Sequence, residues 1–409
     1  MGVDLIRQAV SASFDDIISW LEQQKNHDGA VVYTSVDIRE SSHKIASVDT
    51  NVFPAGFNNL DDPSRDRVSV ALDAFIQRQY PNTTHIFLCC ESHTRNPFYL
   101  DNIHRLSTIL QQLGYAVTMG SFFTGDDGCH QYGYIDGVLS DNRTVRLYGV
   151  HHILAHPDRF DIDLCLLNND LMDGRYDALT QLNVPIVPDP KMGWHRRKKS
   201  DHMVQLNQLT HAMVTDCGLS LDPWQLSTLF SPMPSVTIHH EPDRERLKDA
   251  ASDLLKKINQ KYQQHGIDSD PYLVLKSDNG TYGMGVIQLS DPNDIIRLNR
   301  KNRNKLQKGK ASIPIQNMVI QEGVASVKVV DNNASEEVMY NVDGQTVGGF
   351  YRMHNAKSDR DILNSKGMQF QSLNAHKPGD VSWLGGVNPV SYVIAQLANL
   401  AAQRELMAL

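Results

Sequence analysis

A lysine followed by a glycine-rich turn is the feature of this chain best suited to chemistry. The apolar run Tyr272–Leu275 leads into Lys276, and the polar turn after it contains Gly280, Gly283 and Gly285. Glycines let a backbone approach an anion closely, and a lysine at a strand end adds a positive charge aimed at the same place. The pattern suits nucleotide phosphates. It also fits an ordinary hairpin turn, so the residues downstream must decide between the two interpretations.

Further polar residues follow Lys276 where predicted strands end. The predicted strand Met318–Val324 ends in Gln-Glu-Gly-Val, and Asp343-Gly344 is a strong hairpin signal. The second strand of that hairpin leads into Arg352, and Asn364 lies in the polar stretch beyond it. A strand lysine, a glycine-rich turn, a polar strand end, an arginine and an asparagine therefore follow one another in order.

A predicted hairpin near the N-terminus carries two carboxylates. Its strands cover Ala30–Ile38 and Lys44–Asp49. Asp37 lies in the first strand, and Asp49 and Asn51 end the second. Hard oxygen ligands of this kind suit Mg²⁺. Aspartate is also common as a cap of strands and turns, so a purely structural role stays open.

Length and composition set the class of protein. With 409 residues the chain exceeds the size at which a single core usually stops growing, so two or three domains are expected. The net charge of −8 disfavours a nucleic-acid-binding protein, and no apolar run reaches the length of a membrane span. The N-terminus lacks the apolar core of an export signal, and the five cysteines form no Cys-x-x-Cys pair. These features predict a cytoplasmic protein with reduced thiols.

Residues from about 65 to 190 alternate between predicted helices and strands. The helices include Arg67–Tyr80 and Tyr99–Leu113, and the strands are His85–Cys90, Ala116–Gly120, Arg146–His151, Leu164–Leu167 and Val184–Val187. Such alternation predicts a mainly parallel, doubly wound α/β sheet, with substrates bound beyond the carboxyl ends of the strands. A single polar cluster after a strand can be explained as an ordinary loop, since loops are generally polar. Three such clusters at one edge of the sheet favour a binding site instead. The clusters are Glu91–Asn96, Asn168–Asp173 and Pro188–Trp194.

The order of elements from about 190 to 370 resembles the ATP-grasp ligases, in which ATP lies between two antiparallel sheets. The resemblance implies that Lys276 contacts the phosphates, that the glycine-rich turn covers them and that Arg352 stabilises the transferred phosphoryl group. One lysine of the run Arg197-Lys198-Lys199 would supply the family's second phosphate-binding lysine, and Lys198 is favoured. The implied ATP-binding residues are Lys198, Lys276, Gly280, Tyr282, Gly283, Gly285, Gln321, Glu322, Val324 and Asn364, with Gln321–Val324 along adenine.

The C-terminal end departs from the ATP-grasp pattern. The family continues with a carboxylate strand and a Glu-x-Asn strand followed by proline, whereas Leu384–Pro389 has no acid two residues before Asn388. A matching hairpin is the one near the N-terminus, where Asp49-Thr50-Asn51 precedes Pro54. We infer a circular permutation. Residues 1–60 would complete the C-terminal lobe, 61–190 would form the Rossmann-like substrate domain, and 191–409 would form the ATP-grasp domain.

The permutation makes Asp37, Asp49 and Asn51 the implied metal ligands, for Mg²⁺ or alternatively Mn²⁺. It requires Asp37 and Asp49 to lie beside Arg352 and Asn364. If the two aspartates only cap strands and turns, the reserve ligands are Asn388 and Glu336 or Glu337.

Nearly the whole chain also resembles a narrower family, the glutamate–cysteine ligases of certain proteobacteria. The motifs that carry this resemblance are Val36–Glu40, Val48–Leu60, Glu91–Asn96, Gly193–Lys199 and Lys276–Gly285. It implies ATP-dependent joining of the γ-carboxylate of L-glutamate to the amine of L-cysteine through an acyl phosphate, the first step towards glutathione. Cationic side chains and a metal ion would neutralise charge on the transferring phosphoryl group.

Substrate glutamate needs a cation for its α-carboxylate and an anion for its ammonium group. Arg95 and Glu91 match these needs at a predicted strand end, and Arg39 is expected to act in catalysis by orienting the reacting carboxylate. The other expected substrate contacts are Thr94, Asn96 and Asn58, the last in a loop that would wall the pocket.

Two other functions are compatible with the sequence. One is an ATP-grasp ligase that acts on other amino acids or on a peptide, and the other is a nucleotide-binding regulatory protein without turnover. ADP release that depends on particular amino acids separates the three, since analogy of fold does not determine function.

Overall fold

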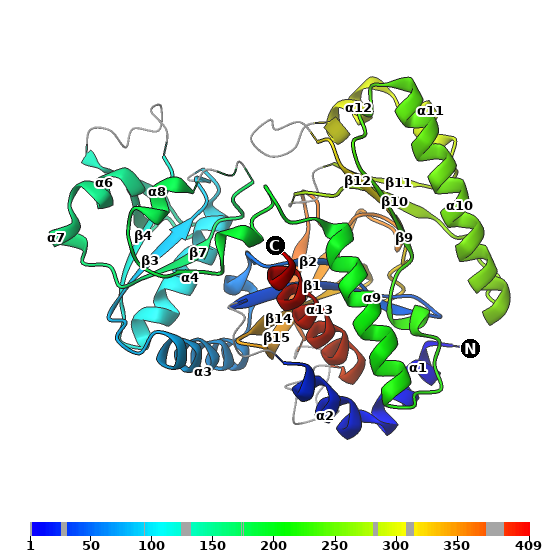
Figure 1. Cartoon of the computed structure of the whole chain (residues 1–409), viewed down its shortest axis with the longest axis horizontal. Helices are drawn as coiled ribbons and strands as arrows, with labels where there is room; N and C mark the ends of the chain where they lie inside the picture. The colour runs from blue at the N-terminus through cyan, green and yellow to red at the C-terminus, as the bar shows by residue number, and fades with distance from the viewer. Residues whose placement is uncertain are drawn as a thin grey trace.

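Three β-sheets and the helices around them make up the molecule (Figure 1). The computed structural model describes residues 2–25, 31–93, 95–123, 132–172, 174, 176–280, 285–307, 315–373 and 388–409. A mainly parallel sheet lies at the left of Figure 1, and a four-stranded antiparallel sheet lies at the upper right. A second antiparallel sheet, here called the central sheet, lies between them. This mixed architecture is that of an α/β protein, as predicted.

The parallel sheet has the strand order β5-β6-β4-β3-β7-β8. Its strands are β3 (His85–Cys90), β4 (Ala116–Ser121), β5 (Tyr134–Val138), β6 (Thr144–Gly149), β7 (Leu164–Asn168) and β8 (Ile186–Val187). All neighbouring pairs are parallel except β5 with β6, which confirms the predicted mainly parallel sheet. The predicted strand Arg146–His151 was wrong at its end, because helix α6 (Val150–Ala155) begins directly after β6. The sequence analysis missed β5, an edge strand with Gly137 inside it and little apolar alternation.

Alternation along β3 explains why helices cover both faces of this sheet. Ile86, Leu88 and Cys90 belong to one apolar core with α3 and α4, whereas Phe87 and Cys89 belong to another with α6, α7 and α8. Because successive side chains of a strand point to opposite faces, a continuous apolar run can be buried on both sides. The helices are α3 (Asp62–Gln79), α4 (Pro97–Gln112), α7 (Pro157–Phe160) and α8 (Asp177–Thr180).

The central sheet combines strands from both ends of the chain. Its order is β16-β15-β14-β1-β2, and β13 also pairs with β14. The strands are β1 (Tyr33–Glu40), β2 (Ile45–Asn51), β13 (Val329–Val330), β14 (Asn333–Val342), β15 (Gln345–His354) and β16 (Gln369–Ser372). The antiparallel register places Asp37 of β1 opposite Val338 of β14 and opposite Asp49 of β2. The N-terminal hairpin therefore lies in the same sheet as the hairpin that carries Arg352.

Helix α13 (Pro389–Ala408) packs between the central sheet and a group of helices. It contacts β1, β2 and β14 as well as α1, α2 and α9. A helix surrounded in this way is apolar on nearly all sides, and Val390, Ile394, Leu397 and Ala401 are all buried. The surrounding helices are α1 (Val3–Ala12), α2 (Phe14–Gln24) and α9 (Lys199–Asp216).

Two predicted helices have different bounds in the structure. The helical spacing from Leu5 to about Gln24 predicts a single helix, but the structure divides it at Ser13, a residue type that favours helix ends over helix interiors. The basic run from His195 predicts a helix that begins there, but α9 begins at Lys199, whose backbone N–H donates to Asp278 O at 2.8 Å. The residues before it form turns.

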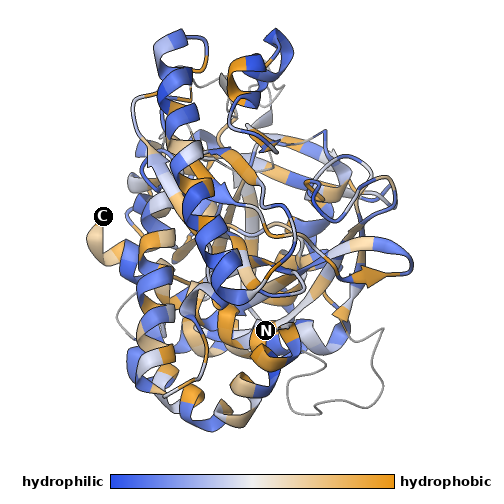
Figure 2. Cartoon of the chain, turned by 90° about the vertical axis from the view of Figure 1, so that its right-hand side faces the viewer, coloured by the Kyte–Doolittle hydropathy of each residue, from blue (hydrophilic) through white to orange (hydrophobic). Residues whose placement is uncertain are grey.

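The four-stranded sheet has the order β11-β10-β12-β9, with all pairs antiparallel. Its strands are β9 (Phe230–Met233), β10 (Leu273–Ser277), β11 (Val286–Leu289) and β12 (Met318–Glu322). Helix α10 (Glu241–His265) buries Leu247, Ala251, Leu254, Ile258 and Tyr262 in one stripe. Their spacing of three and four residues places them on one face, and Figure 2 shows the hydrophilic exterior of this helix. The shorter elements are α11 (Asp294–Arg297), α12 (Arg300–Gln307), η1 (Phe57–Asn59), η2 (Pro190–Met192) and η3 (Pro223–Leu226).

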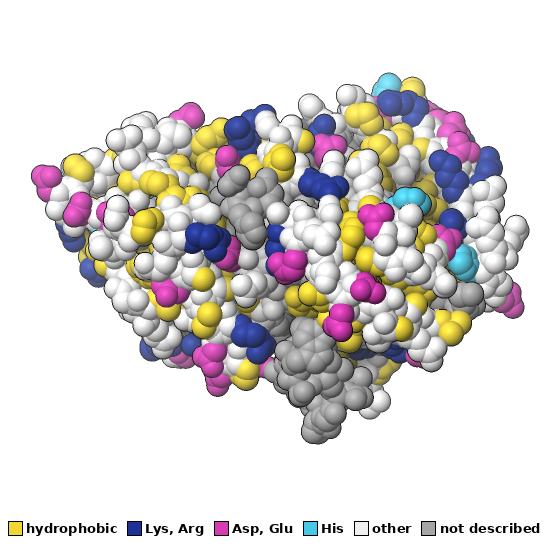
Figure 3. Space-filling model, turned by 60° about the horizontal axis from the view of Figure 1, so that its bottom comes forward, with side chains coloured by type: hydrophobic (Ala, Val, Ile, Leu, Met, Phe, Trp, Pro, Cys, Tyr) yellow, Lys and Arg dark blue, Asp and Glu magenta, His cyan; other side chains and the backbone are white. Residues whose placement is uncertain are grey.

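The exterior carries charges of both signs. On the face shown in Figure 3, lysine and arginine side chains are interspersed with aspartate, glutamate and apolar side chains. Among the described helices, none combines the length and the apolar character that crossing a membrane requires.

Candidate active site

A cavity of about 740 Å³ lies between the four-stranded sheet and the central sheet. Residues of β10 and β12 line one side, and residues of β1, β2 and β14 line the other. Lys199 and the segment Arg360–Asn364 complete the wall. Strands that are far apart in the sequence therefore bring polar side chains to one cavity, which is partly open to solvent.

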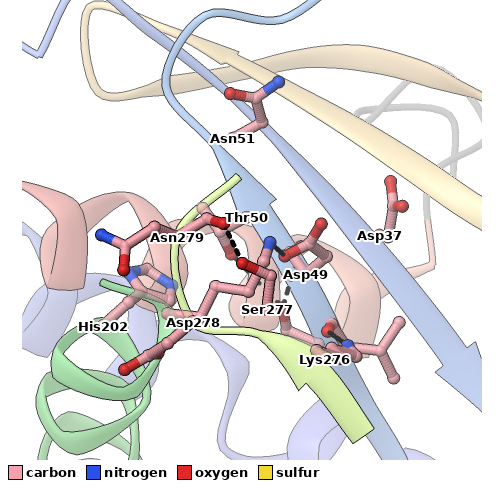
Figure 4. A network of polar contacts seen from close by, with 12 residues as sticks. Asp37, Asp49, Thr50, Asn51, His202, Lys276, Ser277, Asp278 and Asn279 are labelled. Carbon is pink, nitrogen blue, oxygen red and sulfur yellow. Dashed lines mark hydrogen bonds and ion pairs between the residues drawn. The ribbon is translucent and has the colours of Figure 1, made fainter. Parts of the chain in front are cut away.

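Lys276 is the lysine that β10 brings to the cavity. It is 8% exposed, and its Nζ donates to Val48 O of β2 at 2.7 Å. Figure 4 shows its side chain next to Asp49. Burial lowers the pKa of Lys276 to about 8, although the Asp49 carboxylate acts in the opposite direction. A partly desolvated ammonium group attracts an entering anion more strongly than the same group in water would.

The glycine-rich turn after Lys276 is described at its two ends. Gly280 lines the cavity with φ +124°, and Gly285 has φ +67°, both in the region that favours glycine. A Cβ atom at Gly280 would lie 3.8 Å from the terminal methyl carbon of Met172, so the turn approaches the loop after β7. Tyr282 and Gly283 lie outside the described residues.

The basic run supplies Lys199 to the cavity. Lys199 is buried, and its Nζ forms an ion pair with Asp49. Lys198, which the sequence analysis favoured, is the N-cap residue of α9 and is not among the residues that line the cavity. The hydrogen bond from Lys199 N to Asp278 O fixes where the helix begins, and thereby which of the two lysines points inward.

Two arginines hold two of the carboxylates in the cavity. Arg352 Nη1 donates to Asp37 Oδ2 and to Glu336 Oε1, each at 2.7 Å. Arg39 Nε donates to Glu336 Oε2 at 2.7 Å, and Arg39 Nη2 donates to Asp361 O at 2.7 Å. Arg39 thus has several protein partners, and a substrate carboxylate would have to share or replace one of them.

Opposing effects set the protonation of the carboxylates. Burial raises the pKa of Asp37, and the neighbouring Arg352 guanidinium limits that rise. Burial acts on Asp49 in the same direction, but Lys199 and Lys276 together hold the pKa of Asp49 at about 2. Four carboxylates and four cations line the cavity, but one of the carboxylates, Glu322, is already paired with Lys44. The cations left in excess favour an anionic ligand.

The two predicted aspartates, Asp37 and Asp49, both reach the cavity. Asp37 is bonded to Arg352, and Asp37, Asp49 and Asn364 all line the cavity. Asn51 lies apart from them (Figure 4). Its side chain accepts from Phe53 N at 3.1 Å and donates to Phe53 O at 3.2 Å, as asparagines in turns commonly do.

Of the three reserve ligands, Glu336 is the one that lines the cavity. Its neighbour Glu337 lies on the opposite face of β14, where its carboxylate contacts Lys328 and the Ser391 hydroxyl of α13. Asn388 caps α13 and accepts from Val390 N at 2.9 Å. The register that pairs Glu336 with Arg352 is what distinguishes the two adjacent glutamates, and this register is not evident from the sequence.

Apolar side chains form another part of the wall, including Tyr272, Val274, Val286, Val324, Ile362 and Leu363. Gln321 and Glu322 also line it, but their side chains have other partners. Gln321 Nε2 donates to Thr228 Oγ1 at 2.9 Å, and the Glu322 carboxylate pairs with the buried Lys44 at 2.7 Å. The sequence analysis missed Arg360, which lines the cavity with its guanidinium 5.4 Å from the Tyr272 ring centre. Its polar, aperiodic segment offered no signal.

The carboxyl edge of the parallel sheet holds the predicted substrate residues. Glu91 is buried, and its Oε1 accepts from Asp170 N at 2.9 Å, which ties the loop after β3 to the loop after β7. Asn96 caps α4, and Arg95 is exposed. Asn58 is half-buried in η1. None of these four lines the cavity, and Thr94 lies outside the described residues.

Comparison with known proteins agrees with this geometry. The family model described as GshA, glutamate-cysteine ligase, matches residues 7–406. The chain belongs to this family. The ligase is also similar to a solved protein from Methylobacillus flagellatus KT that is named "putative gamma-glutamylcysteine synthetase". That similarity has a TM-score of 0.84 at 30% identity, over 98% of this chain and 96% of the other.

Two further comparisons add little. D-alanyl-alanine synthetase A from Vibrio cholerae O1 biovar eltor str. N16961 has a TM-score of 0.34 at 10% identity, over 77% of this chain and 80% of the other. This similarity to the ligase is too low to support an argument. A search of curated protein sequences found no match.

Membership of this family implies that the ligase uses ATP, typically with a divalent metal. Within the described residues, no group of three or more His, Cys, Asp or Glu side chains is already arranged to hold a metal ion. The donor set nevertheless fits Mg²⁺ with bound ATP, because Asp37, Asp49 and Glu336 offer hard oxygen atoms in one cavity. Their present partners are cations that nucleotide phosphates would also attract, so phosphate binding could release the carboxylates for a metal ion.

Proposed function

We propose that this ligase joins the γ-carboxylate of L-glutamate to the amine of L-cysteine in the cavity between the two antiparallel sheets. The observation that carries the proposal is the meeting of Lys199 and Lys276 with Asp37 and Asp49 in one cavity, with Arg352 bonded to Asp37 at its wall. Phosphoryl transfer needs such an array, because little covalent chemistry is left to the protein beyond positioning and charge stabilisation.

ATP would lie in this cavity as in an ATP-grasp enzyme. Lys276 and Lys199 would bind its phosphates, and the turn from Gly280 to Gly285 would cover them. The apolar wall around Tyr272 and Val324 would receive adenine, with backbone groups of Gln321 and Glu322 as its hydrogen-bond partners. The circular permutation is supported by the place of the β1–β2 hairpin beside β14 and β15.

The proposed reaction has two chemical steps. An oxygen of the glutamate γ-carboxylate attacks the γ-phosphorus of ATP, the bond to the β-phosphate oxygen breaks, and ADP leaves. The cysteine amine then attacks the acyl carbon, loses a proton, and expels inorganic phosphate as the amide forms. Arg352 and Lys276 would stabilise the negative charge that shifts onto the transferring group. Enclosure between the sheets would keep water from the acyl phosphate.

Mg²⁺, or Mn²⁺ in its place, would be held by Asp37, Asp49 and Glu336. Asn51, the third ligand that the sequence suggests, would have to give up its bonds to Phe53 to join them. When bound, the ion would supply additional positive charge next to the phosphates. Asn364 would lie near the same group. Arg39 would orient the reacting carboxylate through its guanidinium.

Glutamate would reach the cavity from the carboxyl edge of the parallel sheet, on the side where the Met172 side chain approaches Gly280. Arg95 would bind the α-carboxylate, and Glu91, Thr94, Asn96 and Asn58 would form the rest of the pocket. The described free cysteines Cys89, Cys90, Cys165 and Cys217 are compatible with the cytoplasmic location predicted from the sequence.

The test is ADP release from the purified ligase with ATP and Mg²⁺, across single amino acids and pairs. Turnover that requires glutamate plus cysteine, with a γ-linked dipeptide as product, is the expected result. Turnover with a different pair of amino acids or with a peptide would support the phosphoryl-transfer site but show that the substrates are other than glutamate and cysteine. ATP binding without turnover for any pair would contradict the proposal and indicate a regulatory protein.

A further inference from the structure

Three buried side chains tie the last turn of α13 to the start of α9. The Glu405 carboxylate accepts from Arg197 Nε at 2.7 Å and from Arg197 Nη2 at 3.3 Å. It also contacts His202 Nδ1. Burial would raise the pKa of Glu405, but Arg197 and His202 hold it below its usual range, so the carboxylate is ionised.

This cluster reaches the strand that carries Asp49. Arg197 Nη1 donates to Thr50 O of β2 at 2.8 Å, next to Asp49 in the chain. Arg197 is only two residues from Lys199, the ion-pair partner of Asp49. Both cations also lie over the buried ring of Trp194, with Arg197 Cζ at 4.7 Å and Lys199 Nζ at 4.6 Å from its centre. The Arg197 guanidinium thus connects β2, which carries Asp49, to the end of α13. Because Arg197 is close to Lys199 in the chain, it also sets where Lys199 lies relative to Asp49.

A small hollow of about 250 Å³ lies next to the main cavity and shares Asp49 and Lys199 with it. Thr50, Arg197 and His202 line its other side. His202 is 5% exposed, and its Nε2 has no hydrogen-bond partner in the described part of the chain. The cluster is therefore part of the wall directly behind the proposed phosphate site, although none of its three members lines the main cavity.

We propose that Glu405, Arg197 and His202 are positioning residues that align Lys199 and Asp49 for the phosphates of ATP. This inference rests on the proposed function and deepens it, because it assigns the end of the C-terminal helix a role in nucleotide binding. Glu405 holds the Arg197 guanidinium in place, and Arg197 holds Thr50 and the segment that leads to Lys199. None of the three touches the reacting atoms.

A purely structural role predicts a different result from a positioning role. Removing one partner of a buried ion pair destabilises the fold, because the other charge is left buried without compensation. A positioning role adds a specific loss of nucleotide affinity, since misplacing groups that hold a ligand or metal typically costs about 10–100-fold. Stability and ATP affinity must therefore be measured separately.

The chain offers a matched control in Glu337. It is also a buried carboxylate with a cationic partner, Lys328, and it also contacts α13, through Ser391. Because it lies on the face of β14 away from the cavity, the substitution E337Q removes a comparable buried ion pair without disturbing Lys199. The substitution R197K is a second variant, which keeps the charge but cannot retain both the Glu405 and the Thr50 contacts in the same geometry.

The experiment measures the dissociation constant of Mg-ATP by titration calorimetry, the thermal unfolding midpoint, and KM for glutamate. E405Q and R197K should each weaken ATP binding about tenfold or more, with KM for glutamate unchanged, whereas E337Q should lower the unfolding midpoint and leave ATP binding intact. Equal ATP affinities for E405Q, R197K and E337Q would overturn the inference. So would unfolding of both E405Q and R197K under conditions in which E337Q is folded. Failure of the unsubstituted protein to bind ATP would instead overturn the proposed function itself.

Discussion

The cavity between the antiparallel sheets and the carboxyl edge of the parallel sheet are both rich in polar residues, but they differ in how these residues are arranged. In the cavity, Lys276 and Asp37 are brought together by strands that are hundreds of positions apart in the sequence. At the sheet edge, Glu91 ties one loop to the next, and Asn96 caps the helix that follows.

This difference helps to distinguish a polar cluster with a catalytic role from one with a structural role. The polar side chains of one loop often serve only as hydrogen-bond partners for backbone groups at strand ends and helix ends, because buried backbone groups need partners. Charged side chains that converge from distant strands have no such local task, and bringing them together requires compensating interactions. The cavity is therefore the stronger candidate for phosphoryl transfer, and the sheet edge remains a proposal for glutamate.

The largest expected effect is at Lys276. The substitution K276A should lower kcat/KM for ATP by about 100-fold or more, because a buried positive charge at the phosphates is lost. Steady-state kinetics at saturating glutamate and cysteine would measure this. An unchanged value would remove the cavity from consideration as the nucleotide site.

Glu336 and Glu337 sharpen the comparison within one strand. E336Q should raise the Mg²⁺ concentration needed for half-maximal activity by about 10-fold or more, because it removes a proposed ligand. E337Q alters the neighbouring residue on the opposite face and should leave that concentration unchanged. If E336Q and E337Q require the same Mg²⁺ concentration for half-maximal activity, Glu336 is not a metal ligand.

Lys199 and Lys198 make a similar adjacent pair. K199A should weaken ATP binding by about 10-fold to 100-fold, since it removes one charge-assisted contact worth roughly 1.5–3 kcal/mol. K198A should change it by less than about twofold, because Lys198 does not line the cavity. Calorimetric titration with Mg-ATP measures both. A larger effect of K198A than of K199A would indicate that Lys198, which the sequence analysis favoured, is the second phosphate-binding lysine.

The pH dependence of ATP binding tests the environment of Lys276. Its pKa is lowered to about 8 by burial, and bound phosphates favour the charged form, so the affinity is greatest below pH 8. As the pH rises through 8, binding requires uptake of a proton, and the affinity should fall about tenfold between pH 7 and pH 9. K276R, which stays charged, should lose this dependence. A fall of the same size in K276R would assign the titration to another group.

The smallest and most selective effect is expected at the sheet edge. R95A should raise KM for glutamate about tenfold or less while leaving KM for ATP unchanged, because an exposed arginine contributes a screened contact. Initial rates with each substrate varied in turn would show this. Equal increases for both substrates would argue against a glutamate site at this edge.

Much of the fold follows from local patterns in the sequence. The continuous apolar run of β3 predicts a strand buried on both faces, and the long amphipathic pattern of Glu241–His265 predicts α10 with its observed bounds. Edge strand β5 could not be predicted in this way, because an edge strand is only partly buried and needs less apolar alternation.

The candidate site was predictable to the extent that residue type limits chemistry. A strand lysine before a glycine-rich turn, an arginine at a hairpin end and aspartates in a short hairpin are each common, and it was their order along the chain and the resemblance to a known family that selected them. Arg360 could not be selected, because its only distinguishing feature is its place in the cavity wall.

The sequence by itself determined the kinds of group that this ligase can present: cations for phosphates, carboxylates for a metal ion, and glycines for a close backbone approach. The tertiary structure alone decided which members of adjacent pairs line the cavity, Lys199 rather than Lys198 and Glu336 rather than Glu337. The physical reason is that helix start and strand register are set by contacts across the fold. For Lys199 the contact is the hydrogen bond to Asp278 O, and for Glu336 it is the pairing with Arg352.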